Sequence, residues 1–365
     1  MHSPFPYDRV STVTEFFGRD NEIKKLSDIV KYSNNLLIHS KRRMGKTSLI
    51  NKFFDINKDN YLTIYVDIFD ISTKEDFVKL LLQSLSNIQK TDLKSAIKTL
   101  TSLFKRVRVE PTIDPNTLEY SIKPIVATLT FEEMIEDFFQ TIDKLSKTQQ
   151  IVIAIDEFQQ ICTIKDIKLD AILRKYIQNR SNISYIFLGS KRHLLTSLFE
   201  YKAPLYELAT HFELQPLNKD DIKEYAMKYI LIDDEIIDYI YNISDGETKM
   251  IQHVLHLCYV EKEKEVTKEQ IDEIVDEIIN SKDSSYRLLF DTLNNNQKQA
   301  LKIVGKYKKG FFTANILNEY NIKKQTLQSS VDSLFKKELI DKNNDIYFIP
   351  DRVFELWIVR LNRNY

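Results

Sequence analysis

The sequence predicts an α/β protein, with a parallel sheet covered by helices, then a helical segment and a small winged-helix tail. Three observations support this fold class. Apolar runs of strand length alternate with helical periodicity through the first ~215 residues, which is typical of buried parallel strands between helices. The next stretch is helical and acidic. The last stretch is basic and combines short helices with two strand-like pieces.

Five apolar runs are the expected strands of the sheet, at residues 36–39, 61–69, 151–155, 185–188 and 212–214. The segment between the second and third runs is mostly helical. Within it, residues 106–109 and 118–122 read as short strands on either side of 111–116. They predict a hairpin insertion at about 104–124. Because Gln215-Pro216 follows the last run, we expect the core domain to span residues 1–216.

Two smaller domains are expected after residue 216. Residues 217–283 have helical periodicity and a net charge of roughly −10, so they predict a separate helical domain. Residues 284–365 have a net charge of roughly +6. Helices are expected there at 296–304, 315–320 and 323–339, with strands near 339–340 and 346–349. Three helices followed by a small hairpin form the outline of a winged helix.

Composition excludes several classes of protein. Six glycines and eight prolines in 365 residues are too few for a collagen-like, linker-rich or low-complexity chain. The two cysteines, Cys162 and Cys258, cannot form a disulfide framework, and we expect both to be reduced, buried thiols of a cytoplasmic protein. The apolar runs are shorter than the ~20 residues of a membrane span, so no membrane contact is predicted. Because 52 basic residues balance 53 acidic ones, the total charge does not point to a polyanionic partner.

The strongest functional signal is the run SKRRMGKTS at residues 40–48, which follows an apolar strand and opens a helix. This is the context of a Walker A loop, in which backbone N–H groups bind phosphates. We expect Gly45 to allow a close backbone approach, Lys46 to bind and stabilise the γ-phosphate, and Thr47 to bind Mg²⁺. The other residues expected to line the nucleotide here are Arg42, Arg43, Met44 and Ser48.

A second motif lies at the end of the third expected strand, where Asp156 and Glu157 follow five apolar residues. This is the Walker B arrangement. Asp156 is expected to hold Mg²⁺, which prefers hard oxygen ligands, and Glu157 to orient or deprotonate the attacking water. Ser190 follows the next strand and Gly189, and is the candidate that hydrogen-bonds the γ-phosphate or the water. The alternative is an ordinary strand-to-turn Gly-Ser pair without nucleotide contact.

A turn upstream of the phosphate loop contains Phe17, Gly18 and Arg19. We expect Phe17 and Arg19 to contact the nucleotide by covering the adenine. A plain turn before a helix is the alternative.

Together these motifs resemble the archaeal-type ATPase family, a branch of the AAA+/STAND P-loop NTPases. The resemblance covers nearly the whole chain. Its motifs are FGRxxE at 17–22, RRxGKTSL at 42–49, DEFQ at 156–159, GS at 189–190 and PDxxFxxW at 350–357. It implies a P-loop ATPase core, a helical lid at 217–283, a winged-helix domain at 284–365, and ATP and Mg²⁺ as ligands.

The chain departs from the family pattern at two places. Ser40 stands where the first Walker A glycine is usual, which could loosen phosphate binding or be tolerated. The lid motif, usually Gly-x-Pro, reads Gly246-Glu247-Thr248. Lys249 follows it and is a candidate sensor cation, with a solvated helix residue as the alternative.

Several arginines are candidates for stabilising the charge of the transferring phosphoryl group. Arg174, Arg180 and Arg192 lie on either side of the strand that leads to Ser190, and surface ion pairs are the alternative role for each. Arg42 and Arg43, within the loop itself, could instead compensate for weak coordination of the phosphates by the backbone.

The basic tail indicates a possible contact with DNA. Lys323, Lys324, Gln325 and Gln328 start the third tail helix, where a recognition helix presents base-reading side chains. The residues expected to contact phosphates are Lys306, Lys308, Lys309, Lys342 and Arg352. Winged helices in this class also contact proteins, so DNA, another protein and self-association all remain open.

The function predicted from these residues is an ATP-binding, ATP-hydrolysing switch that couples nucleotide state to the winged helix. The alternative is a nucleotide-regulated DNA-binding or scaffold protein with negligible ATP turnover.

Overall fold

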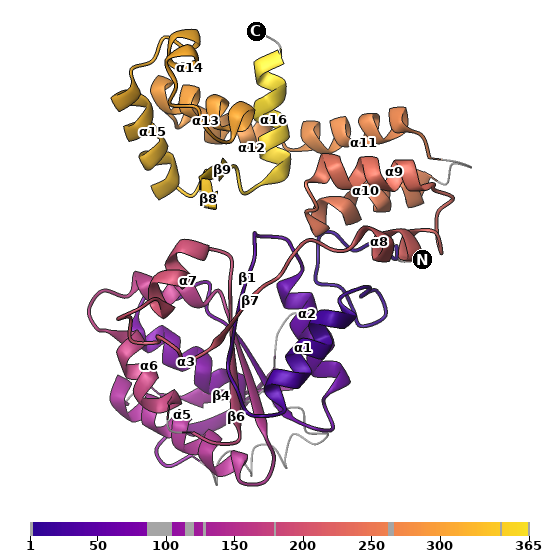
Figure 1. The fold of residues 1–365 in the computed structure, drawn as a ribbon. Coiled ribbons are helices and arrows are strands. Elements are labelled where there is room, and N and C mark those ends of the chain that lie inside the picture. Colours follow the sequence, from indigo (N-terminus) through magenta and orange to yellow (C-terminus); the bar gives the residue numbers. More distant parts are fainter. Residues whose placement is uncertain are drawn as a thin grey trace. The chain divides into compact units, whose positions relative to one another are not determined.

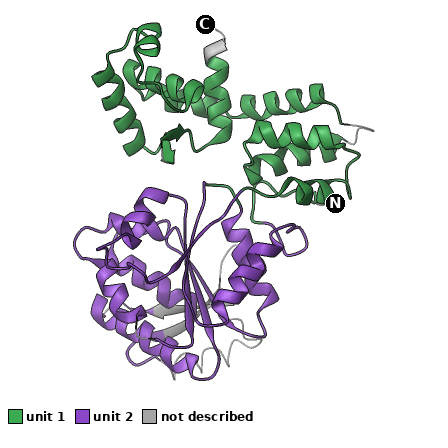
Figure 2. Cartoon of the chain, in the orientation of Figure 1, with its two compact units in different colours: residues 1–10, 42–44, 216–365 green, residues 11–41, 45–215 purple. Residues whose placement is uncertain are grey.

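The chain folds into two compact units (Figure 2). A computed structural model describes residues 3–85, 104–113, 120–126, 129–178, 180–261, 266–343 and 345–363. The core unit consists of residues 11–41 and 45–215, and the second unit of residues 1–10, 42–44 and 216–365. The second unit thus includes a short piece of the loop that carries the predicted phosphate motif.

The core unit is built on a parallel sheet (Figure 1). The order of its strands is β2-β5-β6-β1-β7. The strands are β1 (Leu36–His39), β2 (Leu62–Asp67), β5 (Ile151–Asp156), β6 (Ile183–Gly189) and β7 (Thr210–Glu213). Every neighbouring pair is parallel, so the carboxyl ends of all five strands lie along one edge. The predicted fold class is confirmed, and the strands are the five expected ones with small differences at their ends.

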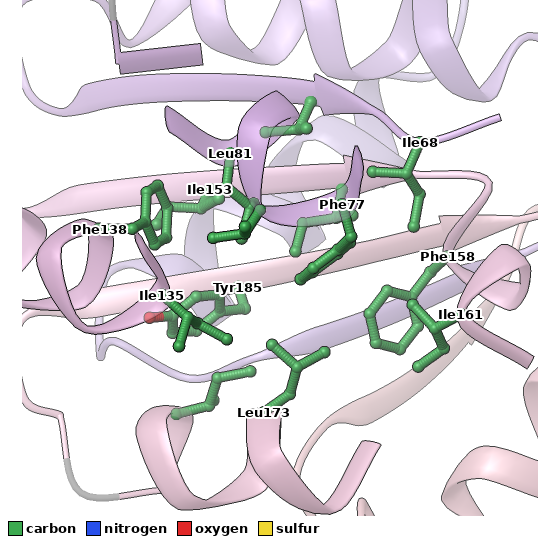
Figure 3. Close-up of a cluster of buried hydrophobic side chains, with 14 of the residues drawn as sticks. Ile68, Phe77, Leu81, Ile135, Phe138, Ile153, Phe158, Ile161, Leu173 and Tyr185 are labelled. Atoms are coloured by element: carbon green, nitrogen blue, oxygen red, sulfur yellow. The ribbon is translucent and has the colours of Figure 1, made fainter. Parts of the chain in front are cut away.

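Helices cover both faces of this sheet, because the side chains of its central strands alternate between two apolar layers. The first face carries α3 (Lys74–Ser84), α5 (Phe131–Ser146), α6 (Leu169–Ile177) and α7 (Arg192–Phe199), and the second carries α1 (Asp20–Val30) and α2 (Lys46–Ile56) (Figure 1). Figure 3 shows the first layer, where Phe77 and Phe138 pack near Ile153 of β5. Burying each such side chain contributes about 1.5–3 kcal/mol.

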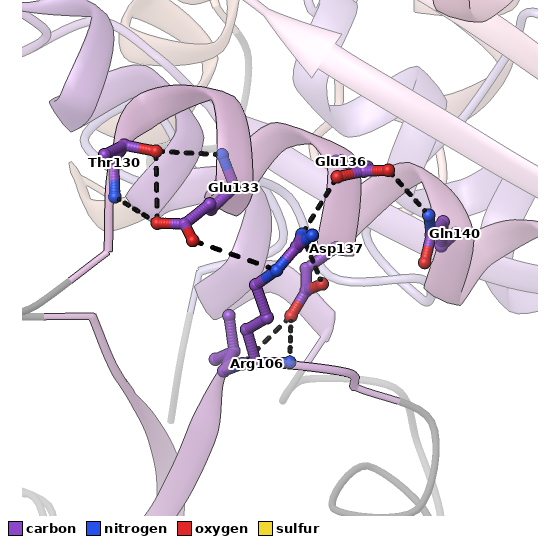
Figure 4. A network of polar contacts seen from close by, with 7 residues as sticks. Arg106, Thr130, Glu133, Glu136, Asp137 and Gln140 are labelled. Atoms are coloured by element: carbon purple, nitrogen blue, oxygen red, sulfur yellow. Dashed lines mark hydrogen bonds and ion pairs between the residues drawn. The ribbon is translucent and has the colours of Figure 1, made fainter.

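Two helices of the first face begin at capping boxes. At α3, the Thr73 hydroxyl accepts the Asp76 N–H at 3.1 Å, and the Asp76 carboxylate accepts the Thr73 N–H at 2.9 Å. Thr130 and Glu133 form the same reciprocal pair at the start of α5 (Figure 4). Each box satisfies helix N–H groups that have no partner within the helix.

The long segment between β2 and β5 contains an antiparallel pair, β3 (Arg108–Ile113) and β4 (Tyr120–Ile125). Their register places Arg108 opposite Ile125 and Pro111 opposite Ile122. Pro111 therefore lies inside a strand and not in the expected turn, and Arg106 precedes the strand in which it was expected. Residues 114–119, which include the end of the expected turn, lie outside the described residues.

A buried carboxylate anchors the chain just before β3 (Figure 4). Asp137 of α5 is fully buried and accepts the backbone N–H groups of Arg106 at 2.6 Å and Val107 at 2.9 Å. The Arg106 guanidinium contacts Glu136 at 2.9 Å and Asp137 at 3.6 Å. A charge buried at this depth is tolerated because it is hydrogen-bonded and paired.

The second unit contains two groups of helices. The first group is α8 (Lys219–Ala226), α9 (Asp234–Ser244), α10 (Thr248–Glu261) and α11 (Lys268–Ser281). The N-terminal segment packs against it, because Phe5 is fully buried with its ring against Tyr225, Tyr229 and Tyr259. The sequence carried no signal for this placement.

The second group has the winged-helix arrangement. Its elements are α12 (Asp283–Asp291), α13 (Asn295–Tyr307), α14 (Ala314–Glu319), α15 (Lys324–Lys336), β8 (Asp341–Asn343), β9 (Ile346–Phe348) and α16 (Arg352–Arg363). Strands β8 and β9 pair antiparallel, and β8 begins two residues after the first expected strand position. The sequence analysis did not predict α16, whose Phe354 and Trp357 pack against Tyr286 of α12.

The cysteines and the helix lengths add two smaller findings. Both cysteines are free thiols; Cys258 is buried, but Cys162 is half-buried, so the expectation of burial is wrong for Cys162. Among the helices that the structure describes, none is long and apolar enough to cross a membrane.

The Asp137 anchor gives a test of the fold. Asp137→Ala leaves the buried N–H groups of Arg106 and Val107 without their acceptor, so we expect a loss of about 1–3 kcal/mol in the free energy of unfolding. Urea unfolding followed by far-UV circular dichroism measures it. Gln140→Ala on the same helix, which removes a surface contact to Glu136, is the control and should change little. Equal effects of the two variants would contradict the anchoring role.

Candidate functional site

The predicted phosphate loop joins β1 to α2 at the carboxyl edge of the sheet. Gly45 precedes the first residue of α2 and has φ +86°, in the left-handed region that favours glycine. A Cβ at this position would meet no atom within 4 Å, so the backbone conformation, and not lack of space, requires glycine. The N–H groups of the first turn of α2 and the helix dipole make this end of the helix suited to binding phosphate.

Lys46 lies over this loop and is buried. Its ammonium is 3.2 Å from the Ser40 hydroxyl oxygen and 3.3 Å from the Lys41 carbonyl oxygen. Ser40 does not have a positive φ, so its backbone does not require the glycine that is usual there. Its hydroxyl also donates to the Lys41 carbonyl at 2.9 Å. The serine is therefore accommodated in the loop and takes part in holding Lys46.

The two expected metal-binding residues lie together. The Thr47 hydroxyl donates to Oδ2 of Asp156 at 2.8 Å, which links the first turn of α2 to the end of β5. A hydroxyl and a carboxylate from neighbouring elements form a set of hard oxygen ligands that fits Mg²⁺. The residues present therefore fit the metal that the motif implies.

Tyr65 of β2 was missed by the sequence analysis. Its hydroxyl donates to Oδ2 of Asp156 at 2.7 Å, and burial together with the Asp156 charge raises the pKa of Tyr65. Tyr65 therefore acts here as a hydrogen-bond donor that orients Asp156. A polar atom within the apolar run at 61–69 was the available signal, but the sequence does not show that β2 pairs with β5.

A third carboxylate, Asp67, pairs with Asp156 in the register of β2 and β5. Burial raises the pKa of Asp67, and the negative charges of Asp156 and Glu157 raise it further, although the Phe69 N–H opposes the shift. This edge of the sheet thus gathers negative charge, as a cation site requires.

Glu157 follows β5 and has a left-handed backbone, with φ 54°. Its N–H donates to Oδ1 of Asp156 at 2.8 Å. Its carboxylate accepts hydrogen bonds from the side chains of Gln159 and Ser190, the latter at 3.2 Å. The structure thus brings the three acidic and hydroxyl residues expected at this site, Asp156, Glu157 and Ser190, to the end of β5 and the end of β6.

The upstream turn that contains Phe17 and Arg19 leads into α1. Arg19 precedes α1, is buried, and donates to the Gln215 carbonyl at 2.5 Å and to Glu22 at 2.9 Å. Its guanidinium therefore ties the start of α1 to the end of the core unit. Phe17, beside it, is half-buried.

The tip of the loop belongs to the second unit. Arg43 has φ 66°, and its guanidinium lies 2.9 Å from Asp351 and 3.8 Å from Glu247. The Arg43 carbonyl accepts the Lys249 N–H at 3.2 Å, and the Met44 carbonyl accepts the Thr248 hydroxyl at 3.4 Å. Met44 is buried, whereas Arg42 forms an exposed ion pair with Glu338 at 3.4 Å.

The acidic partners of Arg43 are the buried Glu247 and the partly exposed Asp351. Burial raises the pKa of Glu247 to about 7, although the positive charge of Arg43 opposes the shift. Glu247 also accepts the Arg352 N–H at 3.4 Å, and the Tyr286 hydroxyl donates to Asp351 at 3.3 Å. Arg43, Glu247 and Asp351 therefore form one linked group of charges, and removing Arg43 takes away the cation that lies beside the buried Glu247.

Gly246, just before this cluster, is needed for both conformation and space. It has φ +69°, and a Cβ would lie 2.8 Å from Cβ of Pro216. The departure from Gly-x-Pro is Thr248 in the proline position, and its hydroxyl donates to the Met44 carbonyl at 3.4 Å.

The three candidate arginine fingers have partners within the core unit. Arg174 donates to the carbonyls of Pro204 and Tyr206. Arg180 contacts Asp143, donates to the Phe139 carbonyl and lies over the Phe139 ring. Arg192 forms an exposed ion pair with Glu213. Within the chain, each therefore has a structural role.

Many of the tail residues expected to contact DNA phosphates form ion pairs inside the winged helix. The pairs are Lys306–Glu319, Lys308–Glu355, Lys342–Asp345 and Arg352–Glu355. Lys323 and Lys324, at the start of α15, are exposed. Acidic neighbours therefore offset much of the positive charge of the tail.

Two family models match this chain. A family model described as an ATPase domain predominantly from Archaea matches residues 16–254, and a model described as a probable winged helix domain matches residues 284–360. No curated protein is similar in sequence.

Solved structures with the same fold include a Walker-type ATPase of Pyrococcus abyssi, with a TM-score of 0.67 and 17% identity, over 98% of this chain and 99% of that one. The ORC2 protein of Aeropyrum pernix, in ADPNP–ADP complexes, has a TM-score of 0.55 and 12% identity, over 99% and 98%. The Aeropyrum pernix ORC1 protein in complex with DNA has a TM-score of 0.53 and 12% identity, over 99% and 97%. Because the first family model covers well over half of its length, the chain belongs to the family of ATPase domains that comes predominantly from Archaea.

Proposed function

We propose that this chain binds Mg·ATP, hydrolyses it, and couples the nucleotide state to its winged helix. One observation carries the proposal: a single loop supplies residues for phosphate and metal binding and also contacts residues next to α10 and α16. Lys46 and Thr47 belong to the phosphate and metal residues of the core unit. Arg43, three residues earlier, pairs with Asp351 at the start of α16 and with Glu247 before α10.

Binding relies on the start of α2. Its first-turn N–H groups and its dipole favour the negative phosphates, and Lys46 adds a positive charge. Arg42, which is exposed apart from its ion pair, supplies a further cation beside the loop. We assign the adenine contact to the turn at Phe17, with Arg19 in a supporting role because its guanidinium is bonded within the core unit.

Hydrolysis uses the residues at the ends of β5 and β6. Thr47 and Asp156 would hold Mg²⁺, which supplies neutralisation of phosphate charge when bound. Glu157 orients the attacking water and accepts its proton, while Lys46 stabilises the charge on the γ-phosphate. Ser190, which contacts Glu157, acts on the water through that carboxylate.

Coupling follows from competition for Arg43. In the structure this guanidinium pairs with Asp351 and Glu247. Phosphates bound at the adjacent helix start attract the same cation, so nucleotide binding weakens its hold on the two carboxylates. The left-handed backbone of Arg43 adds local strain that such a rearrangement can release.

A second candidate is a nucleotide-regulated DNA-binding or scaffold protein with negligible turnover. The internal bonding of Arg174 and Arg180 favours it, because a hydrolysing enzyme of this class gains rate from a free arginine. DNA contact in this version would use Lys323 and Lys324 at the start of α15. ATP turnover above background would decide against it.

Turnover and binding separate these candidates. We expect Lys46→Ala to lose ATP binding and hydrolysis, because it removes the phosphate cation. Glu157→Gln should keep ATP affinity within a few fold and lower turnover by about 10²–10⁴-fold, since only the proton acceptor is lost. Phosphate release and calorimetry measure the two quantities, and Lys58→Ala, at an exposed ion pair, is the control. Glu157→Gln turnover equal to that of wild type would refute the hydrolytic mechanism.

The sole tryptophan, Trp357, is buried in α16 and provides a reporter for coupling. We expect Mg·ATP to change its fluorescence in the wild-type chain, and Arg43→Ala to remove most of that change because the link to Asp351 is broken. Lys342→Ala, at an exposed pair in the same domain, should leave the response intact. A full response in Arg43→Ala would show that coupling does not pass through this arginine.

The Glu247 pKa of about 7 predicts a pH dependence of stability. Above an ordinary value of 4.5, the unfolded chain releases this proton while the folded chain keeps it, so stability falls as pH rises from about 4.5 to 7. The charged neighbours are Arg43, Asp351 and Lys249. Urea unfolding monitored by Trp357 should show a decline of on the order of 1–3 kcal/mol that Glu247→Gln removes. Parallel pH profiles of the two proteins would exclude this titration.

A further inference from the structure

Gln159 is a buried residue to which the proposed mechanism gives no role. It is fully buried in the 3-10 helix η2 (Phe158–Thr163), which follows β5 and Glu157. Its Nε2 donates to Oε2 of Glu157. Within the part of the chain that the structure describes, its Oε1 is buried without a hydrogen-bond partner. A buried amide oxygen without a hydrogen-bond partner is costly, which indicates that the bond from Nε2 to Glu157 has a use.

Gly189, on the neighbouring strand β6, provides the space for Gln159. A Cβ at position 189 would lie 2.1 Å from Oε1 of Gln159 and 2.7 Å from Cδ1 of Leu195. Gly189 does not have a positive φ, so space, and not backbone conformation, excludes a side chain here. The absence of a side chain at position 189 thus leaves room for the Gln159 amide. A side chain at this position would displace that amide.

The hydrogen bonds to Glu157 distinguish its two carboxylate oxygens. Oε2 accepts from Gln159 and, at 3.2 Å, from the Ser190 hydroxyl. Oε1 has the longer contact to Ser190, at 3.4 Å. Two donors therefore hold one oxygen, and the other keeps lone pairs available to accept a proton.

The same carboxylate is fixed to the metal-binding residues through the backbone. The Glu157 N–H donates to Oδ1 of Asp156, whose Oδ2 accepts from Thr47 and Tyr65. The main chain of Glu157 is thereby set by Asp156, while its side-chain direction depends on Gln159 and Ser190.

We propose that Gln159 is a positioning residue for ATP hydrolysis, seated by Gly189, that anchors Oε2 of Glu157 and leaves Oε1 to accept the proton of the attacking water. The water oxygen bonds to the γ-phosphorus as the bond to the β–γ bridging oxygen breaks, and the water proton passes to Oε1. ADP and phosphate leave, and Oε1 then returns the proton to the products. This inference rests on the proposed hydrolytic function.

The test uses the full chain and compares kcat, KM and calorimetric affinity for Mg·ATP. Gln159→Leu removes the donor at similar size, and Gln159→Glu keeps the shape but places an acceptor against Glu157. We expect each to lower kcat by about 10–100-fold while KM and affinity stay within twofold, because misplacing a catalytic group affects the chemical step. Gln160→Leu, the same change one residue along η2, is the matched control and should keep kcat within threefold.

Two further variants guard against misfolding and test whether Gln159 acts through Glu157. Gly189→Ala leaves Gln159 unchanged but pushes its amide away, so it should reproduce the selective loss of kcat. In a Glu157→Gln background, Gln159→Leu should lower single-turnover hydrolysis less than twofold further, since it acts through Glu157. Circular dichroism melting identifies any variant that fails to fold, and Gln159→Glu then takes the place of Gln159→Leu.

The outcomes are distinct. A wild-type chain with turnover, together with a Gln159→Leu effect no larger than that of Gln160→Leu, overturns this inference alone. A raised KM with unchanged kcat also overturns it, because that pattern indicates binding and not positioning. Tight Mg·ATP binding by a wild-type chain without turnover overturns the hydrolytic function, and with it the role of Gln159.

Discussion

The arrangement of the site depends on the burial of β5. This strand lies between β2 and β6, and all six of its residues are buried. A strand covered on both faces favours polar side chains where it leaves the two apolar layers, and its carboxyl end is one such place. Asp156 and Glu157 stand at that point, and the parallel neighbours bring Asp67 and Ser190 to the same edge. The sheet thereby concentrates hydrogen-bonding and acidic groups beside the start of α2.

The hydrogen bond between Thr47 and Asp156 connects two parts of the chain that fold for different reasons. Helix α2 is held by its apolar face, with Leu49, Ile50 and Phe53 packed against the sheet, whereas β5 is held by its ladder. Their polar ends meet because both elements are fixed independently. Such preorganisation means that the site does not have to be assembled by its ligand, which is how charge stabilisation becomes effective in catalysis.

Motifs that are continuous in sequence could be predicted, since Lys46, Thr47 and Asp156 each follow or precede a recognisable apolar element. The five strands were likewise readable because buried parallel strands are continuous apolar runs. Partners distant in sequence could not be predicted. Tyr65 reaches Asp156 only because β2 is the neighbour of β5, and Arg43 meets Asp351 only through tertiary folding. Pro111 misled the reading of the hairpin, because a proline is usual in turns but also occurs in strands of two-stranded sheets.

The packing of Phe5 among three tyrosines of the second unit has a consequence for the order of folding. Residues 11–41 and 45–215 form a unit whose contacts are complete before residues 216–365 emerge from the ribosome. Phe5, in contrast, has its ring partners at positions 225, 229 and 259. During synthesis the Phe5 ring therefore has none of these three partners until more than half of the chain has been made. The second unit is therefore expected to fold after the core unit, and its N-terminal segment stays without these ring partners until then.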